Sequence, residues 1–383
     1  MSRLSLTIHK LCRLLLCLSG CAIFLSLDGL VAASPSFAAE KLVFRYGLFE
    51  ESVPVADIRK YAETKKASTD LQFFLNFLNR KQQETFYGAL QVKMPLNIVA
   101  LDKLANTELG TIFLYGTSQA IARQDPGNVP ALRAAIILGA KSPTGLGIVS
   151  FLEAYPSERI IIDLATATKL VQKADFDSSA SGKPQDNLSS SPVWQLEVNY
   201  HNLATAGKQY HGCLFGDSVS AEIGNGLGET NYNYALNGLS AISLVEQLKL
   251  LAPAKVKCQT AIIAVGGNDA WYGISDAVFV AKLKEAIALT RAMGTKQIYL
   301  IPAFYSTVAV SKDPTVSAPL PKVEAINALI DQVAAAENIP VAAEGIQPLY
   351  DNHVLKDNLT SDGDHLNDEG IKIYRQALLN LLK

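Results

Sequence analysis

Apolar residues recur at helical spacing through much of the first half of the chain. In the run 71–78 they occupy positions i, i+3, i+4 and i+7, which is one face of a helix, and Ser68 precedes the run as a capping residue. Further apolar runs begin after Asn79 and Asn97, and Gln82 stands where a capping box needs it. The pattern predicts a series of short, capped helices.

Two other segments complete this part of the chain. Ser142-Pro143 predicts the first turn of a helix that runs to Leu152, because proline is well accommodated there. The run 159–163 consists mainly of isoleucine and predicts one strand. Residues 41–175 are therefore expected to form a separate, mainly helical domain. The segment 176–195 is rich in Ser, Gly, Pro and Asp and predicts a linker.

From residue 196 onward, apolar runs rich in β-branched residues alternate with helical stretches. This alternation is typical of a parallel sheet that is covered by helices on both faces. Residues 196–383 are therefore expected to form a three-layer α/β domain. The strand-like runs are 210–215, 261–265, 297–302 and 339–343, and the helical stretches are 239–251, 278–293, 325–337 and 370–382.

The first forty residues have the organisation of an export signal. Three basic residues precede the apolar stretch 14–27, and a small-x-small pattern ends at Ala38. We predict a signal peptide over residues 1–38 and a periplasmic or extracellular protein. Two alternatives remain open, a lipidated Cys21 and a retained signal anchor, and either would attach the protein to a membrane.

Composition and charge exclude several classes of protein. Hydrophobic residues make up 49% of the 383 residues and charged residues 18%, which favours a packed core over disorder. The net charge of -2 gives no reason to expect binding to nucleic acid. The chain has no CxxC motif and no histidine-rich cluster, so neither a metal site nor a cofactor is expected.

Polar residues follow the predicted strands at the points where the strands end. Gly-Asp-Ser at 216–218 follows the run 210–215, and Gly-Gly-Asn-Asp at 266–269 follows the run 261–265. Asn237-Gly238 lies between them and follows a further expected strand, the second in the order of the chain. The sequence Asp-Gly-Asp-His-Leu-Asn at 362–367 precedes the last helix. Because ligands bind parallel sheets at the carboxyl ends of the strands, we expect these four segments to meet at one site.

The residue types in these segments are those that acyl transfer requires. A serine hydroxyl is a weak nucleophile without a base, and His365 is the candidate base for Ser218. Asp362 can hold the far nitrogen of the imidazole ring. The backbone N–H groups of Ser218 and Gly238, with the side-chain amide of Asn268, can stabilise a negatively charged tetrahedral intermediate.

Taken in order, the four segments resemble the conserved blocks of the SGNH/GDSL hydrolase superfamily over about residues 209–383. The resemblance implies a flavodoxin-like fold with five parallel strands and metal-independent hydrolysis of esters or thioesters through an acyl-enzyme. It also implies a triad of Ser218, His365 and Asp362. The implied oxyanion hole consists of Ser218, Gly238 and Asn268.

Several neighbouring residues have roles that the sequence leaves open. Asp364 is adjacent to the base and competes for the role of acid, although the Asp-x-x-His spacing favours Asp362. Asp217 is expected to order its own loop and to line the substrate site. Trp271 and Tyr272 are candidates for the same lining, with core packing as an equal alternative. The remaining histidines outside the signal peptide are expected to have a structural role or to lie at the surface: His201, His211 and His353.

Outside the predicted signal peptide the chain has two cysteines, Cys213 and Cys258. If Ser218 and Asn268 are level at the ends of neighbouring strands, Cys213 lies five residues before one end and Cys258 lies ten residues before the other. An offset of five residues is roughly 16 Å along a strand, which is too far for a disulfide. Two unpaired thiols are therefore expected.

The amino-terminal half resembles a helical domain of unknown function that precedes α/β-hydrolase domains in cyanobacterial exported proteins. This resemblance implies no activity. The matching stretches are 55–58, 71–78, 82–83, 131–135 and 160–164.

The leading functional hypothesis is an exported ester hydrolase that acts on small acyl groups, such as acetyl groups on envelope or extracellular glycans. It is preferred because the catalytic part shows no long apolar insertion that could hold a fatty chain. A lipase, lysophospholipase or thioesterase is the alternative. A hypothesis of another class is a surface-binding module, in which residues 41–175 target the protein to a glycan, a membrane or a partner.

Overall fold

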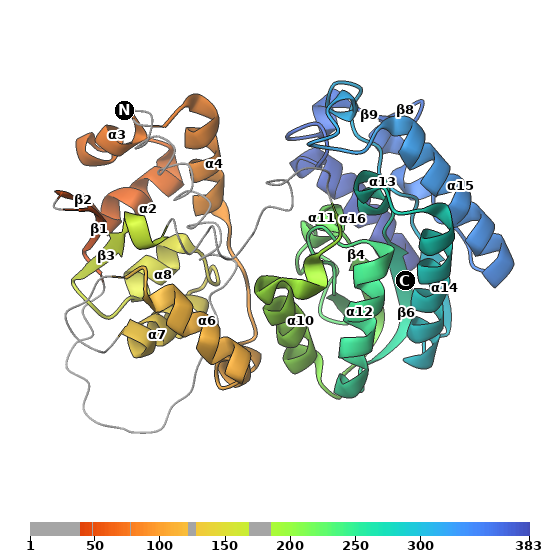
Figure 1. Cartoon of the computed structure of the whole chain (residues 1–383), viewed down its shortest axis with the longest axis horizontal. Coiled ribbons are helices and arrows are strands. Elements are labelled where there is room, and N and C mark those ends of the chain that lie inside the picture. Colours follow the sequence, from red (N-terminus) through yellow and green to blue (C-terminus); the bar gives the residue numbers. More distant parts are fainter. Residues whose placement is uncertain (1–38, 48, 77, 122–127, 168–184) are drawn as a thin grey trace. The chain divides into compact units, whose positions relative to one another are not determined.

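The computed structural model describes residues 39–47, 49–76, 78–121, 128–167 and 185–383. The chain forms two compact units, divided between Phe176 and Asp177, and each is described by itself (Figure 1). The predicted signal peptide, with Cys21, lies outside the described residues. Within the described ranges, no helix is both long and apolar enough to cross a membrane.

The amino-terminal unit contains a three-stranded sheet and a series of short helices. Strand β1 (Lys41–Tyr46) lies between β2 (Phe49–Pro54), which is antiparallel to it, and β3 (Arg159–Asp163), which is parallel to it. The helices are α2 (Val55–Thr64), α3 (Thr69–Leu75), α4 (Arg80–Gln91), α5 (Ile98–Ala105), α6 (Glu108–Ser118), α7 (Asn128–Ala140) and α8 (Ile148–Ala154). The sequence predicted β3 but not β1 or β2.

The caps expected from the sequence are present. The side chain of Ser68 accepts a hydrogen bond from Leu71 N, and Asn79 and Gln82 form a capping box at the start of α4. Asn97 caps α5 through Ala100 N. These bonds satisfy backbone N–H groups that a helix leaves unpaired at its first turn.

The expected helix over 142–152 is shorter than predicted, because α8 begins only at Ile148. The preceding residues pair with another segment instead, since Met94 and Leu146 exchange two backbone hydrogen bonds of 2.7 and 2.8 Å. Gly145 has φ +81°, and a Cβ there would lie 2.4 Å from Met94 O. This tight pairing leaves no room for a helical turn.

The carboxyl-terminal unit contains a parallel sheet in the order β5-β4-β6-β7. Its strands are β4 (Gln209–Gly216), β5 (Asn231–Asn233), β6 (Lys257–Ala264) and β7 (Gln297–Leu300). The expected fifth strand is reduced to one parallel bridge between Leu300 and Val341. A two-stranded hairpin, β8 (Tyr350–Asp351) and β9 (Val354–Leu355), lies outside this sheet.

Helices cover both faces of the parallel sheet, which confirms the predicted three-layer α/β fold (Figure 1). Phe215 and Ile263 face one core together with residues of α12, α14 and α15, whereas Leu214 and Ile262 face a second core with residues of α16. Neighbouring residues of a strand point to opposite faces, so both cores form on one sheet. The helices are α10 (Pro192–Thr205), α11 (Ser218–Ala221), α12 (Ala241–Leu251), α13 (Gly267–Tyr272), α14 (Asp276–Ala292), α15 (Leu320–Glu337) and α16 (Asp368–Leu381).

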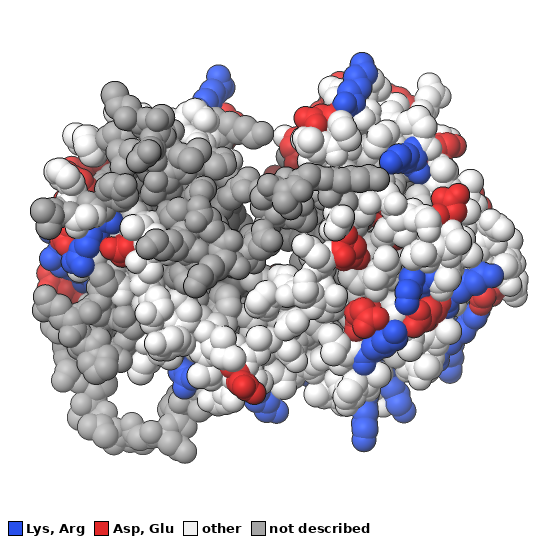
Figure 2. Space-filling view, in the orientation of Figure 1, with Lys and Arg blue, Asp and Glu red and all other residues white. Residues whose placement is uncertain are grey.

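Part of the segment predicted as a linker belongs to this unit. Residues 185–195 are described there, α10 begins at Pro192, and the side chain of Trp194 is buried in the core. On the face shown in Figure 2, acidic and basic side chains are interspersed over α12 and α14, where Lys249 and Lys282 pair with Glu285.

The prediction of two unpaired thiols is wrong, because Cys213 and Cys258 form a disulfide with Cα atoms 5.9 Å apart. The prediction assumed that Ser218 and Asn268 end their strands at the same level. In the sheet, Cys213 pairs with Ala261, which leaves Cys258 three positions away rather than five. Both cysteines face the same core, where their buried side chains meet.

Candidate active site

Ser218 stands at the first position of α11, directly after β4 ends at Gly216. Asp217 caps this short helix by accepting a hydrogen bond from Val219 N at 3.2 Å. The turn between strand and helix is tight, since a Cβ on Gly216 would lie 2.3 Å from Ser220 Oγ. This turn places the Ser218 hydroxyl at the carboxyl end of the sheet, where the sequence predicted it.

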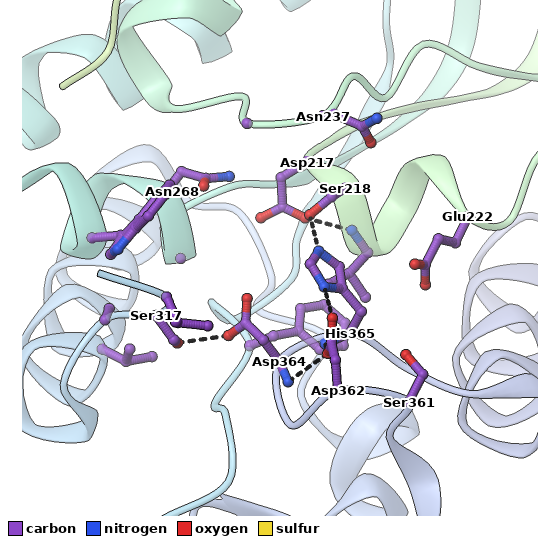
Figure 3. A pocket seen from close by; sticks show the side chains of 18 residues that line it. Asp217, Ser218, Glu222, Asn237, Asn268, Ser317, Ser361, Asp362, Asp364 and His365 are labelled. Atoms are coloured by element: carbon purple, nitrogen blue, oxygen red, sulfur yellow. Dashed lines mark hydrogen bonds and ion pairs between the residues drawn. The ribbon is translucent and has the colours of Figure 1, made fainter. Parts of the chain in front are cut away.

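Ser218, His365 and Asp362 form a continuous hydrogen-bonded chain (Figure 3). His365 Nε2 lies 2.9 Å from Ser218 Oγ, and His365 Nδ1 lies 2.9 Å from Asp362 Oδ2. The first contact allows the ring to take the hydroxyl proton, and the second holds the tautomer in which Nε2 is free to do so. The structure therefore brings together the three residues that the sequence proposed as a triad.

The loop that carries His365 is held by its own backbone. The other oxygen of Asp362, Oδ1, accepts hydrogen bonds from His365 N at 2.7 Å and Asp364 N at 2.9 Å. Gly363 has φ +94°, a conformation that favours glycine, and a Cβ there would lie 2.3 Å from a methyl of Val310. Thr307 N donates to Gly363 O at 2.8 Å, which ties this loop to the chain that follows β7.

Asp362 and Asp364 have different hydrogen-bond partners. Ser317 Oγ donates a 2.6 Å hydrogen bond to Asp364 Oδ1, whereas Asp362 holds the imidazole ring. The two carboxylates are two residues apart but face different partners. Asp362, rather than Asp364, is therefore the carboxylate that is bonded to the ring of His365.

The three expected oxyanion donors lie at the edge of the same pocket. Gly238 has φ +75°, and its carbonyl accepts a 2.9 Å hydrogen bond from the hydroxyl of Tyr272. Asn268 donates one side-chain N–H to Leu239 O at 3.2 Å, which orients the amide and leaves its second N–H available. Tyr272 is buried, so it supports Gly238 and does not line the pocket.

A buried carboxylate ties two of these segments together. Asp269 has no exposed surface, and both of its oxygens accept from Ala241 N, at 3.0 and 3.2 Å. The bond joins α13, the helix that follows β6, to the start of α12, close to Gly238. Burial raises the pKa of Asp269 to about 8, although the hydrogen bond from Ala241 opposes this shift.

Electrostatic interactions in the site shift the pKa of both partners of the imidazole pair. The hydrogen bond to Asp362 raises the pKa of His365 to about 9, although burial opposes it. Burial by itself would raise the pKa of Asp362, but the hydrogen bonds from the ring and backbone of His365 outweigh it and hold that pKa well below its usual value. Burial also raises the pKa of Asp217 to about 7.

The sequence did not single out two residues of the site, Glu222 and Ser317. Glu222 follows Ser218 by one helical turn, and its pKa is raised to about 7 by burial and lowered in part by His365. Its position four residues after the serine was a usable signal, because residues i and i+4 share a helix face. Ser317 lies between β7 and α15 in a segment without regular pattern, so no local signal marked it.

These residues line a cavity of about 490 Å³ (Figure 3). Asp217 and Trp271, proposed from the sequence as lining residues, are among them, and His201, His211 and His353 are not. Within the described part of the chain, no group of three or more His, Cys, Asp or Glu side chains could hold a metal ion. The cavity is lined by Asp217, Ser218, Val219, Glu222, Asn237, Gly238, Gly267, Asn268, Trp271, Phe304, Val316, Ser317, Ala318, Val323, Ser361, Asp362, Asp364 and His365.

Comparison with known proteins gives two sequence matches. Residues 205–373 match the model of the GDSL-like lipase/acylhydrolase family. Residues 38–163 match a family described as an alpha/beta hydrolase of unknown function (DUF1400). No curated protein matches the chain.

Several solved structures resemble part of the chain. A GDSL-like lipase from Bacteroides thetaiotaomicron is 17% identical, with 45% of this chain and 86% of that chain covered and a TM-score of 0.37. An acetylxylan esterase from Geobacillus stearothermophilus is also 17% identical, with 46% of this chain and 94% of that chain covered and a TM-score of 0.36.

Proposed function

We propose that the protein is an exported serine ester hydrolase that works through an acyl-enzyme, because residues 205–373 match the model of the GDSL-like lipase/acylhydrolase family. The observation that carries the proposal is the hydrogen-bonded chain from Ser218 through His365 to Asp362, with both links at 2.9 Å. In the first step His365 takes the hydroxyl proton while Ser218 Oγ attacks the ester carbonyl.

The charge that develops on the carbonyl oxygen is stabilised by donors that are already oriented. The N–H groups of Ser218 and Gly238 and the amide of Asn268 supply them, and losing one such donor typically costs about 10²–10³ in rate. His365 then protonates the leaving alcohol, and a water molecule releases the acyl group by the reverse sequence. Asp362 stabilises the imidazolium in both halves of the reaction.

We rank small acyl groups, such as acetyl on envelope or extracellular glycans, above fatty acyl groups. Between β7 and α15 the only regular element is one short turn of 3-10 helix, Val310–Lys312, and this segment contributes Val316 and Ala318 to the cavity wall. No helical insertion stands there that could extend the cavity for a long chain. A lipase, lysophospholipase or thioesterase is the alternative.

The test compares the mature protein with Ser218→Ala across nitrophenyl esters of increasing chain length. We expect the wild type to prefer the acetyl ester, and Ser218→Ala to lose at least about 10³-fold in kcat. A fluorophosphonate should label the wild type and the control variant Ser189→Ala, whose serine is exposed, but not Ser218→Ala. Full activity in Ser218→Ala would refute the mechanism, and a preference for octanoyl or longer chains would refute the small-acyl assignment.

The proposal of export rests on the signal-like start of the chain and is supported by the disulfide. Disulfides persist mainly in oxidising compartments, and the Cys213–Cys258 bond is of the buried, structural kind. We propose further that the amino-terminal unit binds a component of the cell envelope. This proposal is favoured by the exposure of Ile112 and Tyr115 on α6, at 61% and 63%.

A further inference from the structure

The carboxylate of Asp364 has one oxygen that the protein does not use for the triad or the loop. Asp364 Oδ1 accepts from Ser317 Oγ at 2.6 Å, and the other oxygen points into the cavity toward the space in front of Ser218 (Figure 3). The imidazole is already held by Asp362. The free oxygen of Asp364 is therefore an acceptor presented to whatever occupies the cavity.

This acceptor is held rigidly. The backbone N–H of Asp364 donates to Asp362 Oδ1, and the preceding Gly363 is packed against Val310. The segment that carries Ser317 is anchored as well, since Trp271 Nε1 donates to Pro314 O at 3.0 Å. A fixed acceptor recognises a donor in one direction, which gives specificity as well as binding energy.

The charges around the cavity limit what that donor can be. Its lining includes the carboxyl groups of Asp217, Glu222, Asp362 and Asp364 but no Lys or Arg. An anionic group close to the scissile ester would therefore meet like charges and find no fixed cation. A neutral hydroxyl can donate to Asp364 without this cost.

The aromatic side chain of Trp271 is part of the same wall. It lines the cavity and is joined through Pro314 to the segment that holds Ser317. A half-buried indole that lines the cavity together with an oriented carboxylate offers one apolar surface and one acceptor. A cyclic polyol presents the matching pair, an apolar ring face and hydroxyl donors at its rim.

We propose that the free carboxylate oxygen of Asp364 accepts a hydrogen bond from a hydroxyl of the alcohol part of the ester. Asp364, positioned by Ser317, then acts as a specificity determinant for neutral, polyhydroxylated alcohols such as sugar units. The inference rests on the proposed ester hydrolase function and narrows its substrate class. It adds no covalent step, because the hydroxyl remains bonded to the leaving alcohol throughout.

The test uses the full mature protein and two acetyl esters, an acetylated methyl glycoside and 4-nitrophenyl acetate, whose alcohol has no aliphatic hydroxyl. Asp364→Ala should lower the ratio of kcat/KM for the glycoside to kcat/KM for the nitrophenyl ester by about 10- to 100-fold, mainly through KM. Asp364→Asn, which retains an acceptor oxygen, should lose less. The matched control is Asp357→Asn, which removes an exposed carboxylate outside the cavity and should leave the ratio unchanged.

Three outcomes would overturn the inference. An unchanged ratio in Asp364→Ala would show that the carboxylate does not contact the alcohol. An equal loss on both esters, together with a shifted pH profile, would show that Asp364 acts through His365. A wild-type preference for acetylcholine over the glycoside would show that the carboxylates of the cavity bind a cationic alcohol rather than a neutral one. Failure of the hydrolase proposal is distinct, because the wild type would then hydrolyse neither ester in a Ser218-dependent way.

Discussion

At the scale of single residues, the charge around His365 decides the pH range in which the site can work. The imidazole is hydrogen bonded to Asp362 and feels the negative charge of Asp364 and Glu222, and its pKa is raised to about 9. Catalysis needs the neutral imidazole, so activity should rise as the pH passes upward through this value. The acidic limb of kcat/KM is therefore expected above the ordinary histidine pKa of about 6.5.

Glu222→Gln should move that limb to lower pH. Removing a carboxylate that favours the protonated ring lowers the pKa of His365, and we expect a shift of up to about one pH unit. The measurement is kcat/KM for 4-nitrophenyl acetate between about pH 5 and pH 10, with Glu369→Gln, an exposed residue of α16, as the control. An acidic limb of kcat/KM at the same pH in the wild type and in Glu222→Gln would contradict this role of Glu222.

At the scale of helices and strands, the sequence predicted what depends on neighbours in the chain. Ser68 and Asn79 were recognisable as caps because a cap bonds to N–H groups two or three residues away. Strand β2 was missed because Phe49–Glu51 are all exposed and show no alternation, so its pairing with β1 is visible only in space.

The same limit applies to the site. The four segments that carry the triad and the oxyanion donors could be predicted, because parallel strands bring their carboxyl ends to one edge. The contact between Ser317 and Asp364 joins residues 47 positions apart and depends on how a loop without regular pattern folds back. The level at which neighbouring strands pair is equally invisible locally, and this is why the disulfide was not predicted.

The disulfide between β4 and β6 should contribute substantially to stability. It joins cysteines 45 residues apart, and closing a loop of that size in the unfolded chain corresponds to about 4 kcal/mol. We expect the double variant Cys213→Ala/Cys258→Ala to lose about 2–4 kcal/mol of unfolding free energy in urea. Cys258→Ala alone breaks the same bond and should show most of the same loss of unfolding free energy. In denaturant without reductant, the wild type cleaved after Ala38 should show no free thiol, and finding two would refute the bond.

At the scale of the whole molecule, the chain joins two units with separate sequence matches, residues 38–163 and 205–373. The residues that form the candidate active site all belong to the second unit. In the first unit, Ile112 and Tyr115 lie three residues apart on one face of α6 and are largely exposed. These two side chains are the ones that the proposed binding to the envelope would use.

If α6 binds the envelope, Ile112→Ser/Tyr115→Ser in the full chain should reduce retention on an envelope fraction several-fold while leaving kcat/KM for 4-nitrophenyl acetate unchanged. Both residues are exposed, so the substitutions remove contact surface without opening the core, and circular dichroism should match the wild type. Val278→Ser, at an exposed apolar position of α14 in the other unit, is the matched control. Unchanged retention in the double variant would exclude this face as the docking surface, and a loss of esterase activity would show that the substitutions reach the catalytic unit. Selective loss of retention would separate binding from catalysis between the two units.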